Sequence, residues 1–438
     1  MYKKVPTDLN FVTREGEVEK FWEENRIFEK SVEQREGCPT YMFYDGPPTA
    51  NGKPHIGHVE TRVIKDMIPR YHAMKGQLVP RKAGWDTHGL PVELEVEKEI
   101  GIEGKEGIEA YGVEPFIDKC KESVWKYKGM WEEFSGKVGF WADMENPYVT
   151  YYDDYIESEW WALQQIWNKG LLYKGFKVVP YCPSCGTPLS SHEVAQGYKT
   201  LKERSAIVRF KVKNEDAWFL AWTTTPWTLP SNIALCVNPG EDYVKVKAAD
   251  GYTYYLAKAL LEPVLGGLKT EEQPAYEILK EYKGRELEYK EYEPLYQCAA
   301  DAAAKQHKKC FFVYCDDYVT MTDGTGIVHI APAFGEDDAR VARGYDAPFV
   351  QMVDDHGRMR PESGKFAGMR CKPTEKELKE GAVSADPAVL QDLEERGILF
   401  AAPKMEHDYP HCWRCDTPLI YYARESWFVK MTAVRDDL

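Results

Sequence analysis

The sequence predicts an α/β fold that is interrupted by a separate β-rich block. Three observations support this fold class. A strand, a Gly/Pro-rich turn and a helical pattern follow one another between residues 41 and 76. Short β-rich segments recur between residues 206 and 257. Two C-x-x-C pairs, at 182–185 and 412–415, flank that block. Helices and strands therefore alternate in the first part, and strands dominate the second.

The expected elements are placed by hydrophobic periodicity and by helix start and stop signals. In chain order they are an amphipathic helix over 14–35, a strand over 41–44, a helix from Ile56 that Gly76 ends, a short strand from Leu78, helices over 90–100, 114–139 and 153–170, the β-rich block, and a helix over 387–396 with Asp386 as its cap and Gly397 as its stop. Tryptophans 125, 131, 160, 161 and 167 fall at helical spacing, so they are assigned to the core and given no function.

Length and composition set limits on the class of protein. A chain of 438 residues with 43% hydrophobic residues is too long for one ordinary core, so two or three domains are expected. No segment has the apolar length of a membrane span, and the first residues lack the apolar core of a signal peptide. We therefore expect a cytoplasmic protein without membrane contact. The net charge of −15 argues against a chain that binds nucleic acid non-specifically along its whole surface.

Two histidines stand at the start of the helix that follows the first strand. The glycines and prolines between Gly46 and Pro54 cannot continue the strand, so His55 and His58 lie at a helix N-terminus. Unpaired backbone N–H groups and the positive end of the helix dipole favour phosphate there, and two imidazoles add donors. Histidines three apart can also simply share a helix face and pack. The strand–turn–helix layout favours a nucleotide site.

Four of the eleven cysteines form two C-x-x-C pairs, Cys182 with Cys185 and Cys412 with Cys415. Two such pairs can present four thiolates tetrahedrally to zinc, and a site filled by four protein ligands is structural. Their separation exceeds that of a compact finger. Because the β-rich block lies between them, one metal would join the two ends of that block. Four unligated thiols are the alternative.

Two further motifs lie inside the β-rich block. The first occupies residues 221–232 and the second residues 324–338. Their candidate residues are Thr223, Thr224, Thr225, Thr228 and Asn232 in the first, and His329 and Asp338 in the second. Threonines can line a small pocket and orient a water, while a carboxylate can hold an ammonium group. A threonine run in a strand can equally be β-branched filler.

Residues 55–58 read His-Ile-Gly-His and resemble the HIGH signature of the class I aminoacyl-tRNA synthetases. The flanking stretches 45–52 and 84–93 resemble the isoleucyl branch of that family more closely than the valyl or leucyl branches. The resemblance covers essentially the whole chain. It implies a Rossmann-like nucleotide-binding domain, incomplete here, that is interrupted by a β-rich editing domain with a zinc knuckle at the junction.

The resemblance also implies a reaction: isoleucine is activated by ATP with Mg²⁺ and attached to tRNA(Ile), with His55 and His58 as catalytic residues. The residues that it places around the amino acid and ATP are Gly46, Pro47, Asn51, Gly57, Asp86 and His88. Asp86 would pair with the substrate ammonium, although an Asp at this position can also be a helix cap. Thr49 stands where many relatives have an aromatic residue.

For the β-rich block the resemblance implies an editing pocket. The threonines would surround the 3′-terminal adenosine, and Asp338 would hold the amino group of misattached valine. Isoleucine and valine differ by one methylene, and isoleucyl-tRNA synthetases are the standard example of a hydrophobic pocket that separates such substrates by only ~1–3 kcal/mol. A second, hydrolytic pocket is therefore a physical need of this reaction.

The resemblance extends to the front part of the family's architecture. No Lys-Met-Ser-Lys-Ser-like stretch follows Cys415, and the resemblance implies that such a loop clamps the ATP phosphates. We therefore expect an N-terminal part of a longer enzyme, inactive in aminoacylation but partly competent in editing. A valyl-tRNA synthetase and a free-standing tRNA-deacylating protein are the alternatives.

The expected domains are an N-terminal helix with the first half of the catalytic domain over 1–180, a zinc knuckle over 181–200, the editing domain over 201–398, and the second knuckle with the return to the catalytic domain over 399–438. The expected partners are tRNA(Ile), isoleucine, ATP and, as the edited amino acid, valine. A monomer with one structural Zn²⁺ is expected.

Overall fold

The computed structural model describes residues 10–49, 52–102 and 104–438, and for Glu106 the backbone alone. The chain divides into two compact units. The smaller unit comprises residues 1–172 and 429–438, and the larger comprises residues 173–428.

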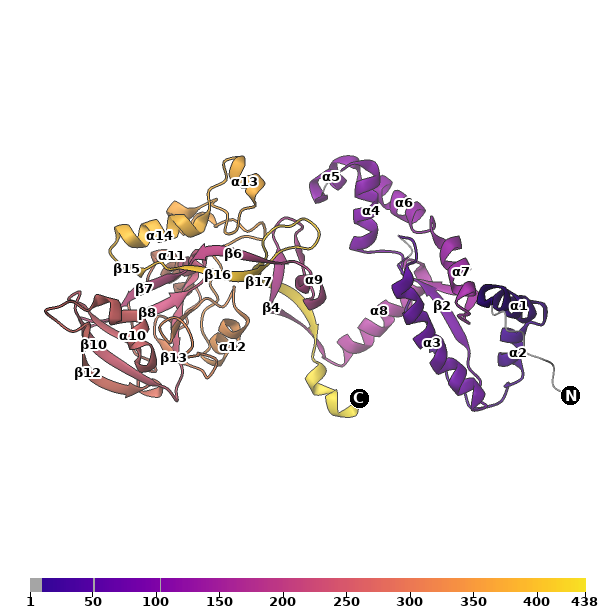
Figure 1. Cartoon of the computed structure of the whole chain (residues 1–438), viewed down its shortest axis with the longest axis horizontal. Helices are drawn as coiled ribbons and strands as arrows, with labels where there is room; N and C mark the ends of the chain where they lie inside the picture. The colour runs from indigo at the N-terminus through magenta and orange to yellow at the C-terminus, as the bar shows by residue number, and fades with distance from the viewer. Residues whose placement is uncertain (1–9, 50–51, 103) are drawn as a thin grey trace. The chain divides into compact units, whose positions relative to one another are not determined.

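A three-stranded parallel sheet forms the centre of the smaller unit (Figure 1). Its strands are β1 (Phe43–Tyr44), β2 (Arg81–Trp85) and β3 (Asp143–Val149), in that order. β1 pairs with β2 in parallel, with Phe43 opposite Arg81. Because parallel neighbours need a crossover, helix α3 (Ile56–Met74) connects them. The predicted strand, turn and helix are confirmed, and Gly76 follows the helix with a φ of 87°.

The other helices of the smaller unit are α1 (Phe11–Glu24), α2 (Ile27–Glu33), α4 (Leu90–Ile100), α5 (Gly104–Tyr111), α6 (Val113–Ser123), α7 (Lys128–Lys137) and α8 (Asp153–Asn168). The single helix expected over 14–35 is wrong, because Arg26 adopts the left-handed conformation with a φ of 49° and separates α1 from α2. The helix expected over 114–139 is also two helices, α6 and α7.

The buried residues of the smaller unit are not all those that the periodicity of its sequence predicts. The α3 residues Ile56 and Met74 are 85% and 84% exposed, and Met67 of the same stripe is exposed as well. The residues of α3 that are buried are Arg62, Pro69 and Ala73. The assignment of the tryptophans to the core is correct for Trp131 and wrong for Trp160, Trp161 and Trp167, which are 68%, 64% and 56% exposed on α8.

A large mixed sheet organises the larger unit (Figure 1). Its strands are β7 (Ala206–Lys211), β8 (Trp218–Thr223), β9 (Ala234–Val237), β10 (Asp242–Ala248), β11 (Thr253–Ala257), β12 (Tyr276–Lys283), β13 (Val313–Cys315), β14 (Ile327–Ile330) and β15 (Leu399–Ala401). The order is β12-β10-β11-β8-β14-β9-β13, and β7 joins β8 to β15. The predicted β-rich block is confirmed.

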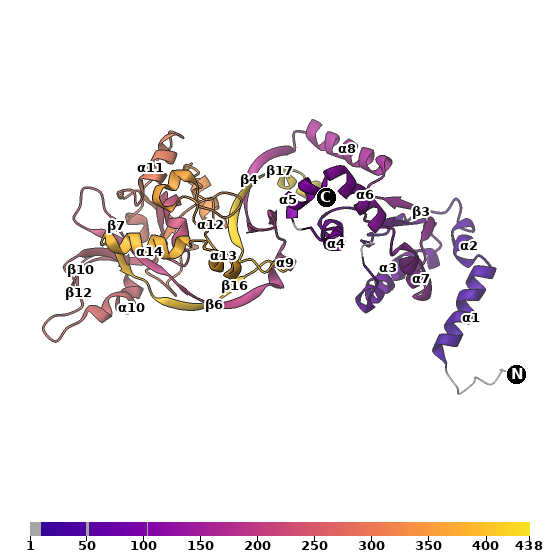
Figure 2. The same ribbon diagram turned by 90° about the horizontal axis from the view of Figure 1, so that it is seen from above.

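Two smaller sheets accompany the large one. β6 (Tyr198–Arg204) and β16 (Lys404–Pro410) form an antiparallel ribbon, visible in Figures 1 and 2. β17 (Ile420–Val429), β4 (Leu172–Cys182) and β5 (Thr187–Pro188) form the other sheet. The helices of this unit are α9 (Ser191–Ala195), α10 (Leu261–Leu265), α11 (Gln297–Ala304), α12 (Glu336–Gly344), α13 (Glu375–Lys379) and α14 (Ala385–Glu395), and the 3₁₀ turn η1 spans Pro226–Ser231.

The core of the larger unit is rich in aromatic side chains. Trp227, Phe210, Phe219, Tyr255 and Tyr292 belong to one buried cluster. Phe210 lies edge-on to Tyr292, with ring centroids 5.5 Å apart. Such rings bury large areas and favour edge contacts, so this cluster fixes the positions of η1 and of the strands around it.

Helix α14 begins differently from the expectation. Ser384 is its N-cap residue, so the assignment of Asp386 as the cap is wrong. Asp386 lies in the first turn, and its carboxylate accepts a hydrogen bond from the backbone N–H of Trp227, at 2.9 Å. Gly397 follows the helix with a φ of 67°, as a helix stop requires. Among the helices of the described residues, none is long and apolar enough to cross a membrane.

The parallel sheet predicts a steric test at Gly84. A Cβ at this position would overlap the ring of Tyr148, whose hydroxyl donates to the carbonyl of Asp45 and so restrains the ring. We expect Gly84→Ala to lower the stability of the smaller unit by about 1–3 kcal/mol. Native-state hydrogen exchange of the β2 amides measures this change. Gly136→Ala in α7 is the control, because its Cβ would meet nothing within 4 Å; equal losses in both variants would contradict the steric explanation.

Candidate functional site

His55 and His58 form a capping box at the start of α3. His55 is the N-cap residue, and its Nδ1 accepts a hydrogen bond from the backbone N–H of Gly57, at 3.2 Å. Nδ1 of His58 accepts from the backbone N–H of His55, at 3.0 Å. The two rings stack with centroids 3.7 Å apart. The helix start is therefore shaped by both imidazoles.

This capping fixes where the histidine protons lie. A neutral imidazole that accepts at Nδ1 carries its hydrogen on Nε2, so each ring keeps one N–H donor for a ligand. Burial lowers the pKa of His58, and the nearby His55 and Arg62 lower it further. The neutral form of His58 is thereby favoured. Packing and ligand binding are thus compatible roles, because they use opposite nitrogens.

A buried ionic group supports the turn before α3. The carboxylate of Asp45 lies 2.9 Å from Nζ of Lys65 and 3.7 Å from Nη1 of Arg62. Nζ of Lys65 also donates to the carbonyl of Gly46, at 2.6 Å. Arg62 packs over the ring of Phe140, and burial lowers its pKa. Two cations against one carboxylate leave a positive excess beneath the turn.

A cavity of 490 Å³ opens above this group. It is lined by Gly46, Pro47, Pro48, Thr49, Gly52, Lys53, His55, His58, Thr61, Arg62, Lys65, Pro91 and Trp131. Of the predicted residues, Gly46, Pro47, His55 and His58 meet here, while Gly57, Asp86 and His88 are outside the lining. Asn51 lies outside the described residues. The periodicity of α3 gave no signal for Arg62 and Lys65, which the sequence interpretation missed.

Asp86 is held by the turn rather than by a helix. Its carboxylate accepts a hydrogen bond from the hydroxyl of Thr49, at 2.9 Å. The alternative that Asp86 caps the next helix is wrong, because the N-cap residue of α4 is Gly89. Thr49, which stands where many relatives have an aromatic residue, therefore orients Asp86. His88 is exposed to solvent.

The threonine motif forms a hydroxyl network at the end of β8. Oγ1 of Thr223 accepts from the backbone N–H of Thr225, at 3.1 Å. The hydroxyls of Thr225 and Thr228 lie 3.2 Å apart. Thr228 also donates to the carbonyl of Thr225, at 2.7 Å. These threonines are more than strand filler, since they define the start of η1. Thr224 is half-buried between them.

His329 joins the second motif to this network. β14 runs parallel to β8, with Val328 opposite Trp222, and so brings His329 beside the threonines. Nε2 of His329 lies 3.0 Å from Oγ1 of Thr228. Burial lowers the pKa of His329 to about 4, which makes the ring neutral at pH 7. Its Nδ1 is buried and has no hydrogen-bond partner in the described part of the chain.

Asp338 is a carboxyl group whose pKa lies close to physiological pH. It lies in the first turn of α12, where one oxygen accepts from the backbone N–H of Ala331, at 2.8 Å, and the other from the hydroxyl of Tyr318, at 3.4 Å. Burial of the carboxyl group raises its pKa to about 7 despite these bonds. Asp338 is therefore poised between its neutral and charged forms. Tyr318 carried no sequence signal.

Asn232 has a structural place in the motif. Its amide donates to the carbonyl of Ala234, at 2.8 Å, and its oxygen accepts from Tyr292, also buried, at 2.7 Å. The side chain is 1% exposed. Its predicted role in a pocket stays a prediction, but its bonds already fix the path of the chain after η1.

The four predicted cysteines come together in one cluster. Cys182, Cys185, Cys412 and Cys415 place their sulfur atoms within 4.8 Å of one another. The pairs 182–415 and 185–415 are each 3.4 Å apart, and the pair 185–412 is 3.9 Å apart. A tetrahedral ion with 2.3 Å bonds to sulfur requires separations of about 3.8 Å. The donor set and its spacing fit a metal ion.

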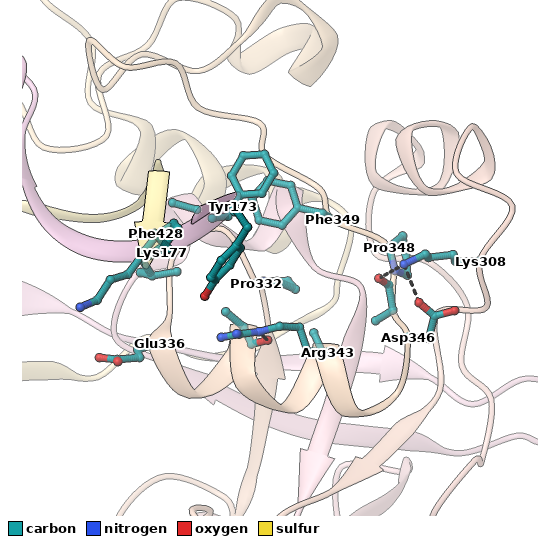
Figure 3. Close-up of a pocket in the computed structure, with 17 residues that line it drawn as sticks. Tyr173, Lys177, Lys308, Pro332, Glu336, Arg343, Asp346, Pro348, Phe349 and Phe428 are labelled. Carbon is teal, nitrogen blue, oxygen red and sulfur yellow. Dashed lines mark hydrogen bonds and ion pairs between the residues drawn. The ribbon is translucent and has the colours of Figure 1, made fainter. Parts of the chain in front are cut away.

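A further cavity of 610 Å³ lies in the larger unit (Figure 3). Glu336 and Arg343 of α12 face it, and Tyr173, Phe349 and Phe428 lie across from that helix. None of the predicted site residues lines it, and Asp338 is not part of its lining. Its lining residues come from four separate stretches of chain, 173–178, 308, 332–349 and 423–428, so sequence spacing gave no signal for it.

Comparison with known proteins places these features in a family. The model of the family described as tRNA synthetases class I (I, L, M and V) matches residues 17–438. The isoleucine–tRNA ligase of Clostridium acetobutylicum is 54% identical over 439 residues, which is 100% of this chain and 40% of that protein. The enzyme of that name from Bacillus thuringiensis strain Al Hakam is 49% identical over 435 residues, 99% of this chain and 40% of its own. The chain thus spans 40% of the length of these relatives.

The raised pKa of Asp338 predicts a pH-dependent stability. Because its pKa is about 7 in the folded chain and near 3.8 when unfolded, the contribution of Asp338 to folding stability is fully present below pH 4 and is lost as the pH rises from there through 7. Asp338→Asn removes this titration and should raise the free energy of unfolding at pH 8 by up to about 4 kcal/mol, with little change below pH 4. Thermal unfolding across this pH range measures it. The control is Asp216→Asn, whose carboxylate is exposed and pairs with Lys211; a gain for Asp338→Asn that is independent of pH would contradict the prediction.

Proposed function

Because the chain belongs to the class I tRNA synthetases, we propose that it is the part of an isoleucine–tRNA ligase that holds ATP and isoleucine in one unit and hydrolyses misattached valine in the other. The observation that carries this proposal is the 49–54% identity, over essentially the whole chain, to proteins named isoleucine–tRNA ligase. The same names favour it over a valyl enzyme. A free-standing deacylating protein would not need the paired histidines.

The proposed synthetic site is the cavity above α3. There the Nε2–H groups of His55 and His58 and the first N–H groups of α3 would bind the ATP phosphates. Lys53, Arg62 and Lys65 line the same cavity and add positive charge. The parallel strands with the α3 crossover support an incomplete Rossmann-like domain as the setting. Mg²⁺ would enter with the nucleotide. In the whole enzyme, catalysis at this site would consist mainly of positioning and charge stabilisation of the in-line attack on the α-phosphate.

The proposed editing site consists of residues 223–232, which we call the threonine loop, together with His329 and Asp338. The Asp338 carboxylate, in its charged form, would bind the α-ammonium group of the aminoacyl ester. Thr225 and Thr228 would orient the ester and a water through their hydroxyls. His329 is neutral, so it would contribute a hydrogen bond rather than a charge. The pocket would admit valine and exclude the larger isoleucine, as the second sieve of this reaction requires.

The proposed metal is zinc. Four sulfur ligands from two C-x-x-C pairs favour tetrahedral Zn²⁺, and a filled ligand set makes the site structural. The ion would join the chain before β5 to the chain after β16. It would supply no step of either reaction.

The zinc proposal predicts a stoichiometric metal. We expect about one zinc per chain, and we expect Cys412→Ser to remove most of it, because three sulfur ligands bind zinc more weakly than four. Metal content by mass spectrometry measures this, together with faster hydrogen exchange over 182–187 and 411–417. Cys38→Ser is the control, since Cys38 lies outside the cluster. Purified chain without zinc, or equal zinc loss in the control, would rule the proposal out.

The editing proposal predicts a preference between two esters. We expect the chain to hydrolyse valyl-tRNA(Ile) faster than isoleucyl-tRNA(Ile). Asp338→Ala should slow valyl hydrolysis about 10- to 100-fold, because a hydrogen bond to a charged group contributes about 1.5–3 kcal/mol. Deacylation rates of both esters measure it. Asp216→Ala, which removes an exposed carboxylate paired with Lys211, should leave the rates unchanged. Similar rates for both esters in the unmodified chain would refute the proposal.

A further inference from the structure

A polar cluster around the buried Lys372 connects the β6–β16 ribbon to the threonine loop. Lys372 is at its centre and is 8% exposed. Its Nζ lies 2.6 Å from a carboxylate oxygen of Glu203 on β6 and 3.1 Å from one of Asp386 in the first turn of α14. The other oxygen of Glu203 lies 3.1 Å from Nε2 of His407 on β16. Nζ also lies 5.1 Å from the ring centre of Tyr409.

The second oxygen of Asp386 acts on the backbone of η1. It accepts from the N–H of Trp227, at 2.9 Å, and Trp227 is 2% exposed. The next residue is Thr228, whose hydroxyl lies 3.0 Å from Nε2 of His329. A shift of the Trp227 backbone therefore moves Thr228 relative to His329. The hydrogen bond from the Trp227 N–H group to Asp386 therefore sets the geometry of the hydroxyl network.

The charges of the cluster explain why Lys372 is important for the hydrogen bond between Asp386 and Trp227. Burial raises the pKa of Asp386, although Lys372 and the Trp227 N–H oppose that rise. The pKa of Lys372 is raised, because Asp386 and Glu203 outweigh the effect of its burial. Removing Lys372 leaves the Asp386 carboxylate without its cation, and this carboxylate must then take up water or a proton. Asp386 thereby loses its fixed orientation.

We propose that Lys372 and Asp386 are positioning residues that hold η1 in register, and thereby determine how well the hydrolytic pocket distinguishes valine from isoleucine. This rests on the proposed editing function. Neither side chain touches the substrate in this role. Both act through the Trp227 backbone on Thr228, and Glu203 and His407 extend the same support to the ribbon that leads to the four cysteines.

The test compares five variants. Asp386→Ala removes the acceptor for Trp227, whereas Asp386→Asn keeps an oxygen there. Lys372→Met removes the cation, whereas Lys372→Arg keeps it. Lys213→Met is the matched control, because it breaks an ion pair, to Glu291, that is solvent-exposed. Hydrogen exchange over residues 226–232 reports the loop directly, and deacylation of both esters reports the pocket.

For Asp386→Ala and Lys372→Met we expect faster exchange at residues 227–229, and valyl hydrolysis that is slower by about 10- to 100-fold, as misplacement by 1 Å causes. The loss should fall on kcat rather than KM, with a smaller ratio of valyl to isoleucyl rates. Asp386→Asn and Lys372→Arg should recover most of the wild-type behaviour. Lys213→Met should behave as wild type.

Wild-type exchange and an unchanged ester ratio in Asp386→Ala and Lys372→Met would overturn the inference. Equal losses in these variants and in Lys372→Arg would also overturn it, because mere disruption of the core would then explain them. Should the unmodified chain show no ester preference, the proposed function fails, while the exchange of the Trp227 N–H still decides the positioning role. If Asp386→Ala does not fold, Lys372→Met against Lys372→Arg provides the same decision.

Discussion

Two half-buried carboxylates, each accepting a hydrogen bond from a backbone N–H group, hold the loops on which the candidate hydrolytic pocket depends. Asp386 accepts from Trp227 in the threonine loop, and Asp338 accepts from Ala331 just after β14. A buried N–H group without a partner is costly, and a loop that leaves a strand has no ladder partner of its own. Both carboxylates lie in the first turn of a helix, where the dipole favours negative charge.

At the start of α3, side chains likewise accept hydrogen bonds from backbone N–H groups. His55 and His58 use Nδ1 to cap the helix and so leave Nε2–H for a ligand. Helix capping and ligand binding therefore do not compete. The positive group of Arg62 and Lys65 against Asp45 lies directly under the turn. An anion at this position would meet both the helix N-terminus and an excess of positive charge.

In the smaller unit, apolar side chains of α3 are exposed to solvent. The stripe on α3 has the period of a buried face, yet Ile56, Met67 and Met74 are exposed. In the larger unit the aromatic side chains around Trp227 are packed in one buried cluster. Periodicity records which face of a helix is apolar. Burial also depends on whether another element covers that face, and in the smaller unit the described residues bury a different side of α3.

Local sequence determined much of this protein. The strand–turn–helix of residues 41–76, the β-rich block and the two C-x-x-C pairs follow from short-range spacing, and each is present as predicted. Tertiary structure alone decided the pairing of Asp86 with Thr49, of Lys372 with Glu203 and Asp386, and of Tyr318 with Asp338. These partners are 14 to 169 residues apart in all. Sequence periodicity reports one element at a time, whereas contacts between elements arise only when the chain has packed.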